Sequence, residues 1–201
     1  MGRVFIIDDD KQASEILKKR GFDIFTTQNA YNLVRYSHEL APSLYVVKSN
    51  LKDTNYHGLV KHLIDNHYTD NAPLVVLHQN GKKSKIFRQG VAHYISENEL
   101  NARLPELAEA YCKGGRKYDL LMVEHIASKR HIQTLMPANL AAFKVCDTQA
   151  ARIFMQKNNV EAVALYCPSD KYDELRSKLD FEKIFHVDNP ENVKDLVSFI
   201  K

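Results

Sequence analysis

The stretch RVFIIDDD, residues 3–10, decides the fold. Its apolar run, Val4 to Ile7, is rich in branched and aromatic side chains and predicts a buried strand. Three aspartates follow immediately, so the strand ends in a group of carboxylates. Burying such carboxylates without partners costs roughly several kcal/mol. The sequence therefore predicts a polar site at the end of this strand.

Short apolar runs of the same kind recur through residues 1–112 and alternate with stretches of helical periodicity. The predicted strands are residues 4–7, 23–26, 44–47, 74–77 and 93–96. The predicted helices are residues 13–20, 30–39, 58–66, 84–89 and 99–111. Strict alternation of strands and helices is typical of a doubly wound parallel sheet in the α/β class.

The pattern is interrupted at Lys113-Gly114-Gly115-Arg116, which predicts a linker or tight turn. Alternation then resumes on a smaller scale. The predicted strands of this half are residues 120–123, 142–146, 162–166 and 183–187, and the predicted helices are residues 126–135, 149–157, 171–179 and 191–200. We therefore expect two domains, residues 1–112 and residues 113–201, the second being a smaller α/β unit.

Composition excludes several classes of partner and site. The chain has 201 residues, of which 44% are hydrophobic, and its 28 Lys and Arg residues nearly balance 25 Asp and Glu residues. This balance gives no broad field for nucleic acid or an anionic membrane. No apolar run approaches the length of about 18 residues that a membrane span needs, so we expect a cytoplasmic protein. Widely spaced cysteines and the absence of glycine-rich phosphate loops predict no metal and no cofactor.

Four motifs at strand ends make residues 3–111 resemble the receiver domain of two-component response regulators. They are RVFIIDDD (3–10), APSLYVVKSNLKDTNYHG (41–58), APLVVLHQ (72–79) and GVAHYISEN (90–98). The resemblance implies a flavodoxin-like fold in which the carboxyl ends of the strands converge on one pocket. In that family the pocket holds an acidic pair for Mg²⁺, an acceptor aspartate, a Ser or Thr, a lysine and a nearby aromatic residue.

The resemblance assigns a residue of this chain to each of those positions. The matching residues are Asp8 and Asp9 for the acidic pair, Lys48 for the acceptor, His78 for the Ser or Thr, Glu97 for the lysine and Tyr94 for the aromatic residue. An ammonium group cannot form an acyl phosphate, and it opposes the binding of Mg²⁺. The resemblance therefore implies a degenerate receiver, or pseudo-receiver, with no catalytic residue.

The substitutions predict a closed pocket. Lys48 stands opposite Glu97, which keeps the family's attraction with its sign reversed, and it could also neutralise Asp8 and Asp9. The pocket would then be locked in one state. In the simpler interpretation, the aspartates form a polar turn and Lys48 is a solvated loop lysine.

A basic run precedes and enters the fourth predicted helix of the first half. It consists of Lys82, Lys83, Lys85 and Arg88. Runs of this kind are usually solvated helix faces. In receiver-like domains, however, partners dock on the face from the fourth helix to the fifth, so the resemblance implies a partner-binding site here.

The second half allows two interpretations. Residues 141–179 resemble part of uroporphyrinogen-III synthase, and a second, shortened receiver-like unit explains the pattern equally well, with Glu124 and Asp170 as acidic strand ends. Two functions follow. One is a signalling or scaffold protein that acts without phosphorylation through contacts with other proteins or with a second copy in a homodimer. The other is an enzyme of the synthase type that acts on a linear tetrapyrrole.

Overall fold

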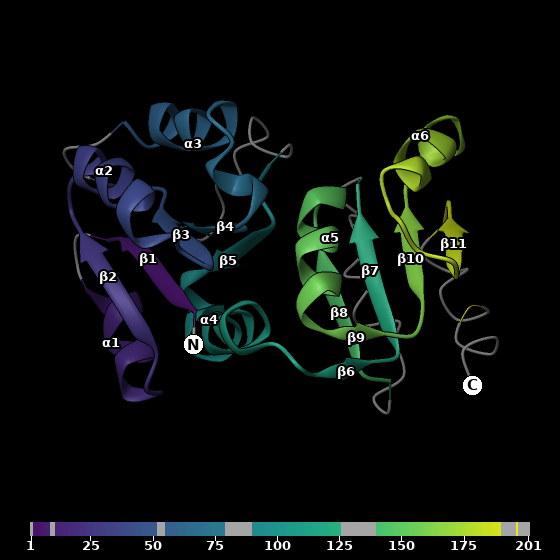
Figure 1. Cartoon of the computed structure of the whole chain (residues 1–201), viewed down its shortest axis with the longest axis horizontal. Coiled ribbons are helices and arrows are strands. Elements are labelled where there is room, and N and C mark those ends of the chain that lie inside the picture. The colour runs from purple at the N-terminus through teal and green to yellow at the C-terminus, as the bar shows by residue number, and fades with distance from the viewer. Residues whose placement is uncertain are drawn as a thin grey trace. The chain divides into compact units, whose positions relative to one another are not determined.

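The computed structural model describes residues 2–8, 11–51, 55–78, 90–125, 140–189 and 196. It divides into two compact units, Met1–Gly114 and Gly115–Lys201 (Figure 1). The division falls within the turn indicated by the sequence. Gly114 and Gly115 have φ angles of 64° and 76°, a region that residues with a Cβ rarely adopt. Two adjacent glycines therefore allow the chain to leave one unit and enter the next.

The first unit is built on a five-stranded parallel sheet. Its strands are β1 (Arg3–Ile7), β2 (Asp23–Thr27), β3 (Leu44–Lys48), β4 (Leu74–His78) and β5 (His93–Ser96), in the order β2-β1-β3-β4-β5. The prediction of a doubly wound, flavodoxin-like sheet is thus confirmed. The strand order reverses between β1 and β3, and in such sheets ligands bind beyond the carboxyl ends of the strands at this switch point.

Helices cover both faces of this sheet. The main helices are α1 (Gln12–Lys19), α2 (Ala30–Leu40), α3 (Tyr56–Asp65) and α4 (Leu100–Ala108). Helices α2 and α3 lie on one face, and α1 contacts α4 on the other (Figure 1). Leu33 and Leu63 pack on Phe5 and Tyr45 from the strands, and all four are buried. This core holds the βα segments at the carboxyl edge in place.

The C-terminal helix of this unit is less regular than predicted. In place of one helix over residues 99–111, the chain forms a 3₁₀ turn η3 (Glu97–Glu99), then α4, then a π turn η4 (Glu109–Lys113). A further 3₁₀ turn, η1 (Tyr68–Asp70), follows α3. The helix predicted over residues 84–89 lies outside the described residues.

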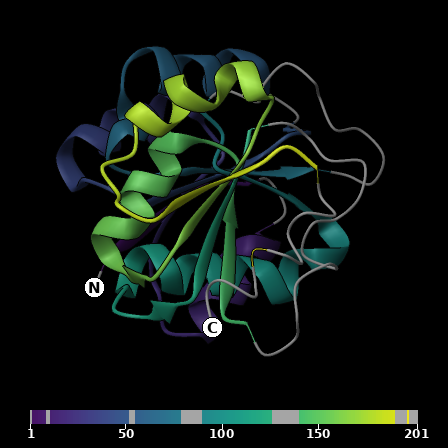
Figure 2. The same ribbon diagram turned by 90° about the vertical axis from the view of Figure 1, so that its right-hand side faces the viewer.

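The second unit contains a four-stranded parallel sheet. Its strands are β7 (Leu120–Glu124), β8 (Ala142–Val145), β10 (Val163–Tyr166) and β11 (Ile184–Val187), in the order β11-β10-β7-β8. Numbered along this unit, the order is 2-1-3-4, which equals that of the first four strands of the first unit. Figure 2 turns this unit toward the viewer.

The remaining elements of the second unit are short. They are α5 (Thr148–Lys157), α6 (Tyr172–Ser177), the 3₁₀ turn η6 (Ser169–Lys171) and a two-stranded sheet of β6 (Lys117–Tyr118) and β9 (Asn159–Val160). The two-stranded sheet is absent from the sequence prediction, because two residues per strand give no periodicity. The helices predicted over residues 126–135 and 191–200 fall outside the described residues, apart from Leu196.

Helix α5 begins at a half-buried carboxylate. Asp147 precedes the helix, and its Oδ1 accepts a hydrogen bond of 2.7 Å from the backbone N–H of Ala150. Burial raises the pKa of Asp147 above the ordinary value of 3.8, and hydrogen bonds to the backbone oppose the rise. The cap therefore stabilises the start of α5, but its charge is partly desolvated.

Asp147→Asn tests this balance, because an amide oxygen caps a helix as well as a carboxylate does and carries no charge. The pKa of Asp147 is higher in the folded than in the unfolded protein. The wild type therefore loses stability as the pH rises from the unfolded to the folded pKa. We expect equal stability of the two proteins at about pH 3, below the ordinary pKa of Asp, and a more stable variant at neutral pH. Urea denaturation at both pH values measures this difference. An equal loss of stability at both would show that the carboxylate itself is required.

Candidate functional site

Asp8 directly follows β1 at the switch point of the first sheet. Its side chain is 3% exposed, and its Oδ2 accepts a hydrogen bond of 3.2 Å from the backbone N–H of Ala13 in the first turn of α1. Lys11, the residue before α1, has a φ of 64° and makes no capping bond with its side chain. Asp8 therefore supplies an acceptor to a helix start that lacks the usual capping side chain.

Lys48 is the last residue of β3, beside Asp8. Because Ile7 pairs with Val47 across the two strands, the next residues, Asp8 and Lys48, come side by side. The Lys48 Nζ lies 3.7 Å from the Asp8 Oδ1, and the lysine side chain is 10% exposed. Two unit charges at this separation attract by about 4 kcal/mol at an effective dielectric constant near 20, before desolvation is subtracted. The structure thus brings these two predicted residues together as a buried ion pair.

The space left around this pair is small. A cavity of about 10 Å³ is lined by Asp8, Gln12, Lys48, Leu77, Glu97 and Leu100. This volume holds about one water molecule. Glu97 faces the same cavity as Lys48, but the two residues have no N–O contact within 4.0 Å. The expected pairing of Lys48 with Glu97 is therefore not a direct ion pair, because the 3₁₀ turn that begins at Glu97 leaves its side chain only half-buried.

His78 is buried at the end of β4, near a carboxylate that the sequence analysis missed. Both the hydroxyl and the backbone N–H of Ser96 donate to Glu99 Oε2, at 2.6 and 3.1 Å. The hydroxyl hydrogen bond is the main cause that lowers the pKa of Glu99, with smaller effects from Arg103 and His78. The pattern Ser-x-x-Glu over residues 96–99 is a capping box, and it could have identified Glu99 from the sequence.

The other predicted site residues lie apart from the cavity or outside the described residues. Tyr94 is half-buried on β5 and packs against the core beneath α2 and α3. Asp9 and the basic run of Lys82, Lys83, Lys85 and Arg88 lie outside the described residues. Within the described ranges, no three His, Cys, Asp or Glu side chains are grouped to hold a metal ion. Nor does any described helix combine the length and apolar character needed to cross a bilayer.

The described part of the pocket leaves little space beside the ion pair. The carboxylate of Asp8 is engaged by an ammonium group and by a helix N–H, and the remaining cavity of about 10 Å³ is smaller than a phosphoryl group. Deleting one partner of a buried ion pair typically costs about 3–5 kcal/mol, so this pair is a strong constraint on the described part of the pocket.

No protein-family model matches the chain, and no curated protein sequence matches it either. Several solved structures do. NtrX from Brucella abortus aligns at 19% identity and a TM-score of 0.49 over 56% of this chain and 27% of that chain. The CheY-like receiver domain protein from Methanospirillum hungatei JF-1 aligns at 20% identity and a TM-score of 0.45 over 53% of this chain and 90% of that chain. The receiver domain of NtrC4 from Aquifex aeolicus aligns at 18% identity and a TM-score of 0.45 over 54% of this chain and 94% of that chain. The sheet order of the first unit is that of a receiver-like fold.

Lys48→Met tests whether the ion pair is a buried constraint. The substitution keeps an unbranched side chain but removes the cation that lies 3.7 Å from the Asp8 Oδ1, so we expect the first unit to lose clearly more than about 1 kcal/mol of stability at neutral pH. Urea denaturation followed by circular dichroism measures the loss. A variant as stable as the wild type would mean that the lysine contributes no buried charge.

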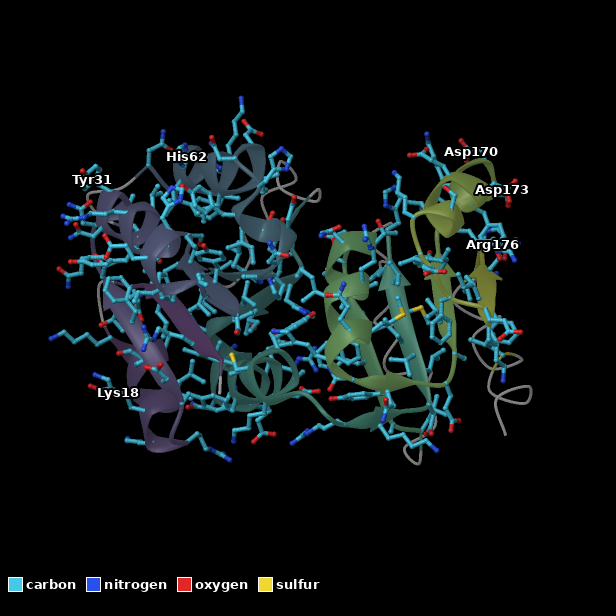
Figure 3. The ribbon with its side chains drawn as sticks, in the orientation of Figure 1. Lys18, Tyr31, His62, Asp170, Asp173 and Arg176 are labelled. Atoms are coloured by element: carbon cyan, nitrogen blue, oxygen red, sulfur yellow. The ribbon has the colours of Figure 1, made fainter. Side chains whose placement is uncertain are left out.

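Two further variants make the result specific. Lys18→Met removes an exposed lysine from the same unit and should change stability little (Figure 3). Adding Asp8→Asn to Lys48→Met removes the unpaired charge, so the double variant should recover part of the loss. A double variant that is less stable than Lys48→Met by the full cost of Asp8→Asn alone would show that the two residues are not coupled.

Proposed function

We propose that the first unit is a pseudo-receiver held in one state, and that the protein is a signalling or scaffold protein acting through protein contacts without phosphorylation. The observation that carries this proposal is the buried Asp8–Lys48 ion pair, which closes the pocket at the switch point. Lys48 stands where the resemblance implies the acceptor aspartate.

The chemistry of the pocket supports the loss of phosphorylation. An acyl phosphate forms when a carboxylate oxygen attacks phosphorus and the leaving group departs on the opposite side. A charged lysine at the attacking position has no carboxylate oxygen, and its positive charge opposes a divalent cation at the same place. Asp8, the described carboxylate nearest to Lys48, already binds the lysine and the α1 backbone.

A receiver-like domain without phosphorylation can still act as a binding module. A ligand or modification shifts a conformational equilibrium only through different free energies of interaction with the two states. With the pocket closed by an internal ion pair, the domain keeps one arrangement of its surfaces. Partners would then bind constitutively. The basic run of Lys82, Lys83, Lys85 and Arg88, which lies outside the described residues, remains our proposed docking site for other proteins.

The alternative activity has less support. No observation on the described residues favours an enzyme of the uroporphyrinogen-III synthase type acting on a linear tetrapyrrole. The second unit repeats the strand order of the first four strands of the first unit, which fits a chain built from two related binding modules.

Treatment with acetyl phosphate and Mg²⁺ tests the proposal. We expect the intact mass of the protein to remain unchanged, because the pocket offers no free carboxylate at the acceptor position. Lys48→Asp is the matched variant, since it places a carboxylate there and gives Mg²⁺ an additional oxygen ligand. A stable gain of one phosphoryl group by the wild type, abolished by substituting a single aspartate, would overturn the proposal.

A further inference from the structure

A second pocket lies at the same edge of the first sheet. It is lined by Gln28, Asn29, Ala30, Tyr31 and Val34 around the start of α2, and by Asn55, Gly58, Leu59 and His62 around the start of α3. Its volume is about 740 Å³, within the range of about 300–1,000 Å³ found for small-molecule sites. Both helices follow strands of the parallel sheet, so the pocket lies at the carboxyl edge where such sheets bind ligands.

The pocket has an apolar wall with an aromatic ring at its rim. Ala30, Val34 and Leu59 contribute aliphatic surface, and Tyr31 is 71% exposed. Tyr31 on α2 and His62 on α3 lie at the same end of the unit (Figure 3). Gly58 adds no side chain, and a Cβ there would lie 3.2 Å from the Asn55 Nδ2. A glycine inside a helix costs about 1 kcal/mol relative to alanine, and here it leaves room for the capping side chain of Asn55.

The asparagines present nitrogen rather than oxygen to a ligand. Asn29 Oδ1 accepts from the Tyr31 N–H at 2.8 Å, and Asn55 Oδ1 accepts from the Gly58 N–H at 3.1 Å. These bonds cap α2 and α3 and engage one backbone donor at each helix start. The Nδ2 group of each asparagine can therefore donate to a ligand in the pocket.

His62 adds a third donor. The Asn66 Nδ2 lies 2.9 Å from the His62 carbonyl oxygen, which can only accept, so this atom is the amide nitrogen. The same nitrogen lies 3.2 Å from the His62 Nδ1 and donates to it. A neutral imidazole that accepts at Nδ1 carries its proton on Nε2. Asn29, Asn55 and His62 thus each offer an N–H donor, Gln28 and Tyr31 add groups that both donate and accept, and none of the lining residues is a carboxylate.

We infer that this pocket binds a small aromatic carboxylate, with its ring against Tyr31 and its oxygens on the side-chain N–H groups of Asn29, Asn55 and His62. An ionised carboxylate only accepts hydrogen bonds, so it matches a lining rich in donors better than a primary amide does. The inference is independent of the proposed function, because this pocket shares no lining residue with the cavity around Asp8 and Lys48.

Benzoate is the probe for the test. Amide NMR spectra of the full chain should show saturable shifts on adding benzoate, confined to residues 28–34 and 55–62. Benzamide should bind more weakly, since its NH₂ group cannot accept from the N–H donors where a carboxylate offers an oxygen. Cyclohexanecarboxylate should bind more weakly because it lacks the flat ring. Shifts that are absent, non-saturable or spread over the surface would overturn the inference. Equal binding of benzamide would overturn the assignment of a carboxylate.

Two variants of α2 form the matched pair. Tyr31→Ala removes the aromatic wall and should weaken benzoate binding by about two- to tenfold, the equivalent of one aromatic contact. Leu40→Ala removes the other large hydrophobic side chain that is exposed in the described part of the chain, at the far end of the same helix. It should leave binding unchanged. An equal effect of the two substitutions would show that benzoate does not bind in this pocket.

Discussion

The buried ion pair between Asp8 and Lys48 joins two strands and a helix at the carboxyl edge of the first unit. Asp8 directly follows β1 and also binds the first turn of α1, while Lys48 ends the neighbouring strand β3. One carboxylate therefore links strand pairing to the start of a helix. Two charges removed from water are costly, but removing only one partner costs more than the pair contributes. Once both residues are present, neither can be lost alone without a penalty.

The second unit neutralises a strand-end carboxylate in a different way. Glu124 is the last residue of β7, the first strand of the four-stranded sheet, and Asp8 directly follows β1, the first strand of the five-stranded sheet. Its cation is Lys144, whose Nζ lies 2.8 Å from the Glu124 Oε2. Lys144 comes from the second strand of its unit, whereas Lys48 comes from the third strand of the first unit. In both units a lysine thus neutralises a carboxylate at the end of the first strand. The two lysines come from strands on opposite sides of that first strand.

The sequence predicted the strands well because the central strands are buried on both faces and appear as unbroken apolar runs. The bounds of β5 agree with the prediction, and those of β1 differ by one residue. Elements that depend on pairing with distant segments or on local helical winding were not predictable from the sequence. The pair β6 and β9 has two residues in each strand, and the π turn after α4 changes helical winding without changing the apolar pattern.

The candidate site was predictable only to the extent that topology determines it. Parallel strand ends converge, so the proximity of Asp8 and Lys48 follows from their positions at the ends of neighbouring strands. Glu97 begins a 3₁₀ turn, and its distance from Lys48 depends on loop geometry that residue types do not specify. The larger pocket depends on the space between α2 and α3 and on Gly58, a residue whose effect is the absence of a side chain. At one edge of the same sheet, a charge pair closes one cavity, while the spacing of two helices leaves another open.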